Sequence, residues 1–252
     1  MKVVRFAIGN RARYGILSEK SVQAIKGKPF HHIKPAAEHY DLNKVRLLSP
    51  CLPSKVVALG LNYLSHAKEI NAPLPPAPLI FLKPPTAVIG PEDNIIYPPS
   101  SKRVDYEGEL GAVIGRRAWR VPKEKVSDYV LGYTCFNDVT ARDLQSLDGQ
   151  WTRAKGFDTF AAIGPYIETQ LDPANLKLQT YLNGKLKQEA RTSDLIFPIP
   201  ELVSFISNVM TLLPGDVIAT GTPSGIEPML PGDTVEIRIE SIGTLRNYVV
   251  RG

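Results

Sequence analysis

Most apolar residues of this chain lie in short runs separated by glycine, proline, asparagine and aspartate, a pattern typical of β-strands. Residues 3–8 and 13–17 bracket Gly9-Asn10, which predicts a hairpin turn, and Asn183-Gly184 is the pair favoured in two-residue hairpins. Residues 55–60 read as a buried strand. We therefore predict a structure dominated by strands.

Helical periodicity is rarer than strand patterning. It occurs at residues 62–70 and again at residues 200–212, where Pro214 ends the second helix. The second helix is predicted to have one apolar stripe, formed by Leu202, Phe205, Ile206, Val209 and Met210. Few helices among many strands predict an α+β, β-rich fold.

The segment 71–99 contains nine prolines, a content that could indicate a disordered linker. Apolar pieces at residues 79–82, 87–89 and 95–97 lie between these prolines, however. We predict short strands joined by stiff loops, with prolines at strand ends where no ladder N–H is required. Residues 71–78, which are polar and rich in proline, are expected to form a mobile flap.

The tetrapeptide Leu-Pro-Gly-Asp occurs at residues 213–216 and again at residues 230–233. Each copy precedes a strand-like run, and proline followed by glycine suits the centre of a type II turn. The repeat therefore predicts two equivalent turns rather than a repeated binding site.

Composition narrows the class of protein. A chain of 252 residues with 43% hydrophobic and 22% charged residues can bury a core as one large domain or two unequal ones. We predict a small N-terminal domain at residues 1–50 and a larger domain at residues 51–252, because the character of the sequence changes near Pro53. The cysteines, Cys51 and Cys135, form no C-x-x-C motif, so neither a disulfide framework nor a zinc site is predicted.

The net charge of +5 does not predict a nucleic-acid partner, because the densest basic runs, at residues 101–103 and 116–117, lack interleaved aromatic residues. The same charge is compatible with a small anionic substrate. No apolar run approaches the roughly 20 residues of a membrane helix, and lysine and arginine interrupt any signal-like N-terminal segment. We expect a cytoplasmic protein with no membrane partner.

Three carboxylates pose the main chemical question. Asp105, Glu107 and Glu109 occupy alternate positions, so in a single strand they would share one face at a spacing of about 7 Å. Two charges at that distance repel by roughly 2–3 kcal/mol at an effective dielectric of 20. A hard divalent cation would make the arrangement favourable, whereas a solvated edge strand would screen the repulsion. On spacing alone, both interpretations stay open.

A fourth carboxylate, Asp138, lies at the end of the apolar run 129–136. If a helix begins there, Asp138, Arg142 and Gln145 fall on one helical face, where they could form part of a site. The alternative is an N-capping aspartate followed by ordinary surface residues, and the motif alone favours that alternative.

Three more patterns could carry chemistry. His66 and Glu69 would be neighbours on a helix, as a water-activating pair or as a surface ion pair. Lys155 lies in an otherwise apolar neighbourhood. Residues 218–225 lack the phosphate-loop pattern, but their amides and the Thr222 hydroxyl could hold a carboxylate; a plain turn is the alternative.

In combination, these motifs resemble the fumarylacetoacetate hydrolase family in the short form typical of bacterial and archaeal members. Between residues 53 and 225 they follow the family's order: G-x-N-Y-x-x-H-A-x-E, F-x-K-P, D-Y-E-x-E-L, D-V-T-A-R-D-x-Q, a lysine before an aromatic residue and aspartate, and L-x-P-G-D-x-I-x-T-G-T-P-x-G. The resemblance implies a mixed β-sandwich roll with a small N-terminal domain, usually in a homodimer.

The resemblance also implies a metal site. Glu107, Glu109 and Asp138 match the family's ligands for Mg²⁺ or Mn²⁺, and Lys155 matches the lysine beside the metal. Asp105 matches no assured ligand.

Five further positions match residues of the family's substrate site. Arg142, Gln145 and Thr222 correspond to residues that line the substrate's oxygen atoms. His66 and Glu69 correspond to the lid dyad that activates water in hydrolytic members.

The implied function is that of a divalent-metal-dependent enzyme acting through an enolate on small 2-oxo, acylpyruvate-like dicarboxylic acids. The His66–Glu69 pair favours C–C bond hydrolysis of an acylpyruvate or fumarylpyruvate, because hydrolysis alone requires an activated water. The alternatives are an isomerase, decarboxylase or tautomerase of aromatic catabolism, acting for instance on 2-hydroxyhepta-2,4-diene-1,7-dioate or oxaloacetate. A rival from a different class is a non-catalytic binder of dicarboxylates.

Overall fold

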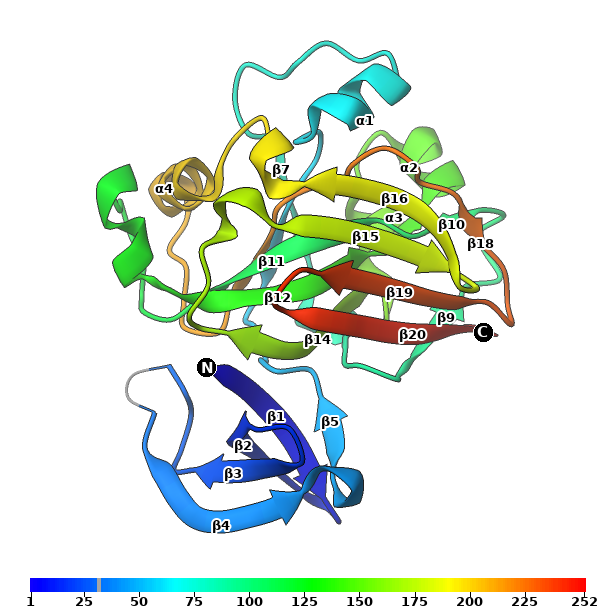
Figure 1. Cartoon of the computed structure of the whole chain (residues 1–252). Coiled ribbons are helices and arrows are strands. Elements are labelled where there is room, and N and C mark those ends of the chain that lie inside the picture. Colours follow the sequence, from blue (N-terminus) through cyan, green and yellow to red (C-terminus); the bar gives the residue numbers. More distant parts are fainter. Residues whose placement is uncertain (31–32) are drawn as a thin grey trace.

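The computed structural model describes residues 1–30 and 33–252, and these residues form three sheets (Figure 1). Along the largest sheet the strand order is β4 (Pro35–Asp41), β3 (Ser21–Ile25), β2 (Arg11–Leu17), β1 (Lys2–Ile8), β14 (Ala161–Glu168), β12 (Val130–Asp138), β11 (Gly108–Ile114), β17 (Val217–Ala219), β6 (Val56–Leu59) and β7 (Ile80–Lys83). Two short strands join this sheet at the side: β5 (Arg46–Leu48) pairs with β1, and β8 (Val88–Ile89) pairs with β14.

The second sheet packs across the central strands of the first. Its order is β16 (Lys185–Arg191), β15 (Lys177–Leu182), β19 (Thr234–Ile239), β20 (Gly243–Arg251) and β9 (Asn94–Tyr97). A third, small sheet consists of β13 (Thr140–Ala141), β10 (Val104–Asp105) and β18 (Pro228–Met229).

The α-helices are short and lie around the sheets: α1 (Leu64–Glu69), α2 (Arg142–Asp148), α3 (Thr152–Gly156) and α4 (Ile199–Val209) (Figure 1). Within the described residues, no helix has both the length and the apolarity that crossing a membrane requires. The prediction of a β-rich α+β fold is confirmed.

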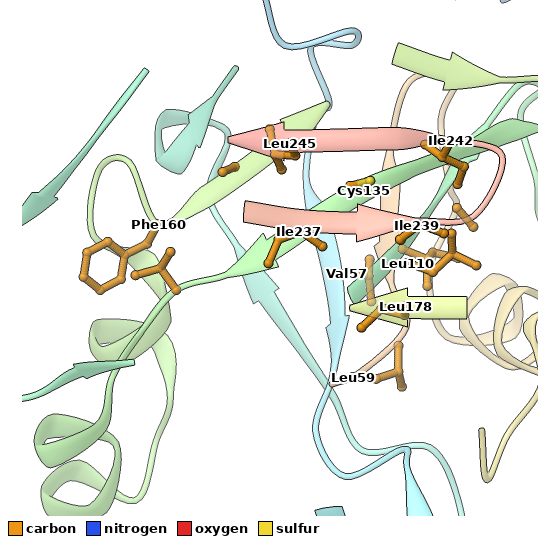
Figure 2. Close-up of a cluster of buried hydrophobic side chains, with 14 of the residues drawn as sticks. Val57, Leu59, Leu110, Cys135, Phe160, Leu178, Ile237, Ile239, Ile242 and Leu245 are labelled. Atoms are coloured by element: carbon orange, nitrogen blue, oxygen red, sulfur yellow. The ribbon is translucent and has the colours of Figure 1, made fainter. Parts of the chain in front are cut away.

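The hydrophobic core fills the space between the two larger sheets. Figure 2 shows side chains from both sheets meeting there, with Leu110 and Cys135 from one and Leu178, Ile237 and Leu245 from the other. Each of these five residues is at most 1% exposed. Two sheets that bury facing side chains in this way form a sandwich, which accounts for the alternation of buried and exposed residues along β20.

The predicted turns are present, and backbone conformation explains their residues. β15 and β16 are joined by Asn183 and Gly184, whose φ angles of 51° and 74° both lie in the left-handed region that a type I′ hairpin turn requires. Gly9 and Asn10 likewise join β1 to β2. The proline-rich segment forms strands β7, β8 and β9, as predicted, instead of a disordered linker.

Two details of the predicted helices are wrong. The first helix begins at Leu64 instead of residue 62, and α4 ends at Val209 instead of residue 212. Val209 is 57% exposed and therefore does not belong to the buried stripe, because the backbone leaves the helical conformation at Met210.

The two Leu-Pro-Gly-Asp segments form equivalent turns. In the first, Asp216 N–H donates to the carbonyl of Leu213 at 3.0 Å, and the Asp216 carboxylate accepts from Leu213 N–H at 2.8 Å. The second repeats both contacts between Asp233 and Leu230, at 3.0 and 2.7 Å. Gly215 and Gly232 have φ angles of 92° and 102°, the conformation required after proline in a type II turn.

Residues 1–50 contain β1 to β5, drawn in blue in the lower part of Figure 1. They share the largest sheet with the rest of the chain, because β1 pairs with β14 at Lys2–Glu168 and Val3–Ile167. The division into a separate N-terminal domain at residue 50 stays a prediction.

Asp216 connects the starts of two parallel strands and is expected to be important for stability. It is fully buried, and its carboxylate accepts from Ser54 N–H and Ser54 Oγ at 2.9 and 2.7 Å and forms an ion pair with Lys55. Asp216→Ala leaves these donors without a partner and should reduce the free energy of unfolding by about 3 kcal/mol or more, measured by urea denaturation. Glu124→Ala, at an exposed position, should change it by less than about 0.5 kcal/mol, and equal effects would contradict the prediction.

Candidate metal and substrate site

Three predicted metal ligands converge at the ends of two neighbouring strands. Glu107 directly precedes β11, Glu109 lies within it, and Asp138 is the last residue of β12. The two strands are antiparallel, and Asp138 N–H donates to the carbonyl of Glu107 at 2.9 Å. Each residue offers one carboxylate oxygen, and these oxygens all lie within 4.8 Å of one another in the buried interior.

Buried lysines offset this negative charge. Lys155, from α3, places its Nζ 2.7 Å from Glu107 Oε2 and 2.6 Å from Asp138 Oδ2. Lys83, the last residue of β7, donates to Asp138 Oδ1 and to the carbonyl of Val139. Lys83 was not among the residues predicted for the site. The available signal was the F-x-K-P motif, which places a lysine in an apolar strand.

The pKa values of Glu107 and Glu109 are shifted in opposite directions. Burial and the nearby charges of Asp138 and Glu107 raise the pKa of Glu109 well above its usual range. Burial also favours neutral Glu107, but the charges of Lys155 and Arg142 outweigh it and hold the pKa of Glu107 well below its usual range.

Burial likewise lowers the pKa of Lys83 to about 8, although the Asp138 charge opposes this shift. Lys155 shows the reverse balance: burial would lower its pKa, but Asp138 and Glu107 raise it. The two lysines therefore differ in how firmly they hold their charge.

These residues fit a divalent cation. Glu109 Oε2 accepts from Gly221 N–H at 2.8 Å, whereas Glu109 Oε1 is buried and has no hydrogen-bond partner among the described residues. An unpaired buried carboxylate oxygen is costly. Three carboxylate oxygens within 4.8 Å also match the roughly 4–5 Å across which the oxygen ligands of one hard cation lie.

The expectation that Asp105, Glu107 and Glu109 share one strand face is wrong. The strand is interrupted, so Asp105 ends β10 in the small sheet while Glu109 belongs to β11. The Asp105 carboxylate instead accepts from Arg103 and Arg142, with Nε–O distances of 2.9 Å in both pairs.

The helix after Asp138 is also placed differently from the prediction. It begins at Arg142, because residues Thr140 and Ala141 pair with β10 as strand β13. Asp138 is therefore neither a helical residue nor an N-cap. Arg142 and Gln145 still share a face of α2, and Arg142 donates to Gln145 Oε1 at 2.7 Å and also to Glu107.

One residue of the triad, Glu107, lines a cavity of about 540 Å³. Five predicted site residues outside the triad also line this cavity: His66, Arg142, Gln145, Lys155 and Thr222. Residues 72–76, within the predicted flap, line it as well. The mobility predicted for this flap stays a prediction.

Thr222 lies at the cavity with its hydroxyl already engaged. Its Oγ1 donates to the carbonyl of Gly108 and accepts from Gln188 Nε2, both at 2.9 Å. In this arrangement its proton does not point to a ligand. Gln188 is 1% exposed and was not predicted, since nothing in the local sequence indicates that β16 contributes to the site.

His66 and Glu69 form the predicted pair on α1, with His66 Nδ1 and Glu69 Oε2 2.8 Å apart. His66 is only 8% exposed whereas Glu69 is exposed, so the pair joins a buried imidazole to a carboxylate at the surface. The other oxygen of Glu69 accepts from Gly225 N–H at 2.8 Å, and Ser65 Oγ accepts from Ser224 N–H at 3.3 Å. Helix α1 is thus attached to the loop that carries Thr222.

Comparison with known proteins identifies the family. Residues 55–250 match the family model described as fumarylacetoacetate (FAA) hydrolase C-terminal, and residues 1–50 match the model described as Rv2993c-like, N-terminal. The fold resembles that of 5-carboxymethyl-2-hydroxymuconate delta-isomerase from Mycobacterium smegmatis, with 46% identity, a TM-score of 0.95 and full coverage of both chains.

Two further relatives perform different reactions. Maleylpyruvate hydrolase from Sphingobium sp. SYK-6, whose structure contains manganese(II) and pyruvate, is 31% identical with a TM-score of 0.83 and full coverage of both chains. Mitochondrial oxaloacetate tautomerase FAHD2B from Bos taurus is 42% identical over 221 residues, which are 82% of this chain and 70% of the relative. The predicted resemblance is confirmed, and this chain belongs to the fumarylacetoacetate hydrolase family.

Proposed function

We propose that the protein is a divalent-metal-dependent enzyme that converts a 2-oxo acid of the acylpyruvate type through an enolate, by hydrolysis of a C–C bond. The observation that carries this proposal is the position of His66. It is held by Glu69 and lines the same cavity as Glu107 and Lys155. A base, one of the three proposed metal ligands and a lysine therefore border one space in which a small acid can bind.

Glu107, Glu109 and Asp138 would hold the cation, because each offers a converging carboxylate oxygen and Glu109 Oε1 has no hydrogen-bond partner among the described residues. When bound, a divalent cation supplies Lewis-acid stabilisation of the negative charge that develops on a substrate's oxygen atoms. The manganese(II) and pyruvate in the related maleylpyruvate hydrolase support this assignment.

The charge of the site favours an anionic substrate. Three carboxylates and one divalent cation have a net charge of about −1. The positive charges of Lys83, Lys155 and Arg142 bring the net charge of the site to about +2. Arg142 and Lys155 line the cavity and can bind a substrate carboxylate there. Gln145 accepts from Arg142 through Oε1, which leaves its amide nitrogen to donate to a substrate oxygen.

The His66–Glu69 pair supplies the base for hydrolysis. Because Glu69 binds Nδ1, Nε2 of His66 is the nitrogen that can take a proton from water. The resulting hydroxide attacks the acyl carbonyl carbon, and the C–C bond to the pyruvate portion breaks. Its electron pair forms the enolate of pyruvate, which recovers the proton from His66. The products are a carboxylic acid and pyruvate.

Isomerisation or tautomerisation is the second candidate reaction. The isomerase from Mycobacterium smegmatis and the bovine tautomerase are 46% and 42% identical to this chain, against 31% for the hydrolase. In these reactions His66 would move a proton between substrate atoms, and no water would be consumed. Decarboxylation of an oxaloacetate-like acid passes through the same enolate.

Turnover of a substrate panel tests the reaction. With Mg²⁺ or Mn²⁺ and not with EDTA, wild-type protein should convert acetylpyruvate to acetate and pyruvate, identified by NMR. His66→Ala and Glu69→Ala should each reduce kcat by about 10²–10⁴-fold because the base or its support is lost, while oxalate still binds. Oxaloacetate, fumarylpyruvate and 2-hydroxyhepta-2,4-diene-1,7-dioate complete the panel. Isomerised products without acetate would select the second candidate, and binding without turnover of any acid would indicate a non-catalytic binder.

Thermal denaturation tests the metal site without relying on activity. Mn²⁺ at 100 times its Kd should raise the Tm of the wild type by about 5–10 °C, corresponding to about 2.7 kcal/mol of linkage. Glu109→Gln should abolish that shift. Without metal it should fold with a similar Tm, since it removes repulsion with Glu107 and Asp138.

The matched control is Glu236→Gln. Glu236 is also a buried carboxylate, but it pairs with Arg238 and Arg246 on the second sheet. This variant should keep the full Mn²⁺-induced shift. An unchanged shift in Glu109→Gln would contradict the assignment of Glu109 as a ligand.

A further inference from the structure

The cavity beside the metal ligands has two chemically different ends. Its charged end contains Glu107, Arg142 and Lys155, with Gln145 in contact with Arg142. Most of the remaining wall is apolar and is formed by Leu59, Leu61, Ile70, Leu74, Leu79, Phe81, Trp151 and Ile226. Among the described residues that line the cavity, Arg142 and Lys155 are the only arginine and lysine.

The apolar wall begins next to the charged end of the cavity, and a series of side-chain contacts continues it away from that end. Lys155 Nζ lies 5.0 Å from the ring centroid of Phe81, and that ring meets the ring of Trp151 edge-on at 5.2 Å. Trp151 in turn covers Gly60, where a Cβ would approach both Trp151 and Leu79 to 3.0 Å. The wall is therefore continuous, and Gly60 is required for Trp151 to lie this close.

Large apolar side chains remain exposed at the rim of this wall. Ile70, Leu74 and Leu79 are 51%, 54% and 50% exposed, and all three line the cavity. Single exposed apolar residues are common on protein surfaces, whereas a cluster around one cavity indicates a contact surface for a ligand. The prolines at 73, 75 and 76 restrict the backbone that carries Leu74, so little conformational freedom is lost when a ligand binds.

We propose that this wall binds an apolar acyl group, so that the preferred substrate is a 2-oxo monocarboxylate with an alkyl or aryl acyl chain. This inference rests on the proposed function, and it changes the expected substrate class from dicarboxylic to monocarboxylic acids. Arg142 and Lys155 bind the 2-oxo acid end, and the acyl chain extends past Phe81 toward Trp151 and Leu74. A second carboxylate at that position would lose hydration without meeting a cation among the described residues that line the apolar wall.

Two matched acids test this inference on the Mn²⁺-loaded protein. Butanoylpyruvate and succinylpyruvate differ only in a terminal methyl group or carboxylate. The wild type should have a kcat/KM at least about tenfold higher for butanoylpyruvate, and the value should rise from acetyl- to butanoyl- to hexanoylpyruvate. Equal values, or a preference for succinylpyruvate, would overturn the inference.

A substitution that adds a positive charge to the apolar wall tests whether this wall determines the preference between the two acids. Leu74→Arg places a cation at the exposed rim and should raise the kcat/KM for succinylpyruvate relative to butanoylpyruvate by about tenfold or more. Leu52→Arg is the matched control, because Leu52 is 61% exposed and does not line the cavity. It should leave the ratio unchanged, and an equal change in both variants would contradict a role for Leu74.

Binding separates failure of this inference from failure of the proposed function. If the wild type converts none of the 2-oxo acids, the proposed function is wrong. Isothermal titration of the Mn²⁺-loaded protein with the same two acids then decides the inference alone. Tighter binding of butanoylpyruvate by about tenfold supports the apolar subsite, and tighter or equal binding of succinylpyruvate excludes it.

Discussion

The structure depends on how three carboxylates are kept together away from water. At 4.8 Å, two unit charges repel by roughly 3 kcal/mol even at an effective dielectric of 20, which is a substantial fraction of the stability of a typical domain. Lys155 and Lys83 offset part of this cost by direct contact, and the raised pKa of Glu109 removes another part. Glu109 Oε1 is left without a hydrogen-bond partner among the described residues, so the cost of the cluster and its fit to a cation follow from one arrangement.

The surrounding backbone holds this cluster in place. Gly221 donates its N–H to Glu109. A larger residue is excluded at this position for two reasons. The φ angle of Gly221 is 98°, and a Cβ there would lie only 2.8 Å from the Cβ of Asn62. Asn62 binds the carbonyl of Thr220 at 2.7 Å, so the segment before α1 is tied to the segment after β17. Asp105, which lies outside the triad, accepts a hydrogen bond from Arg142 Nε. It thereby holds a residue of the charged end of the cavity in place.

Sequence patterns predicted what depends on local conformation. The Asn183-Gly184 hairpin and both Leu-Pro-Gly-Asp turns follow from backbone preferences, and the site motifs occur in family order. The errors arose where the conformation of a segment depends on pairing with residues distant in the sequence. The break before Glu107 exists because β10 pairs with β13 and β18 instead of continuing into β11, and this pairing also delays the helix to Arg142. Lys83 was missed for a related reason: its partner Asp138 lies 55 positions along the chain, and no periodicity encodes that contact.

The attachment of α1 shows why the histidine and the cavity belong to one unit. Glu69 uses one oxygen to hold His66 and the other to accept from Gly225 N–H, so the carboxylate that orients the imidazole also fastens the helix to the loop carrying Thr222. A movement that lifts α1 from this loop removes the support of Glu69 from the loop side and changes the position of His66 over the cavity. Glu69 therefore joins the orientation of His66 to the attachment of α1, and Ser65, which accepts from Ser224 N–H, adds a second contact to the same loop.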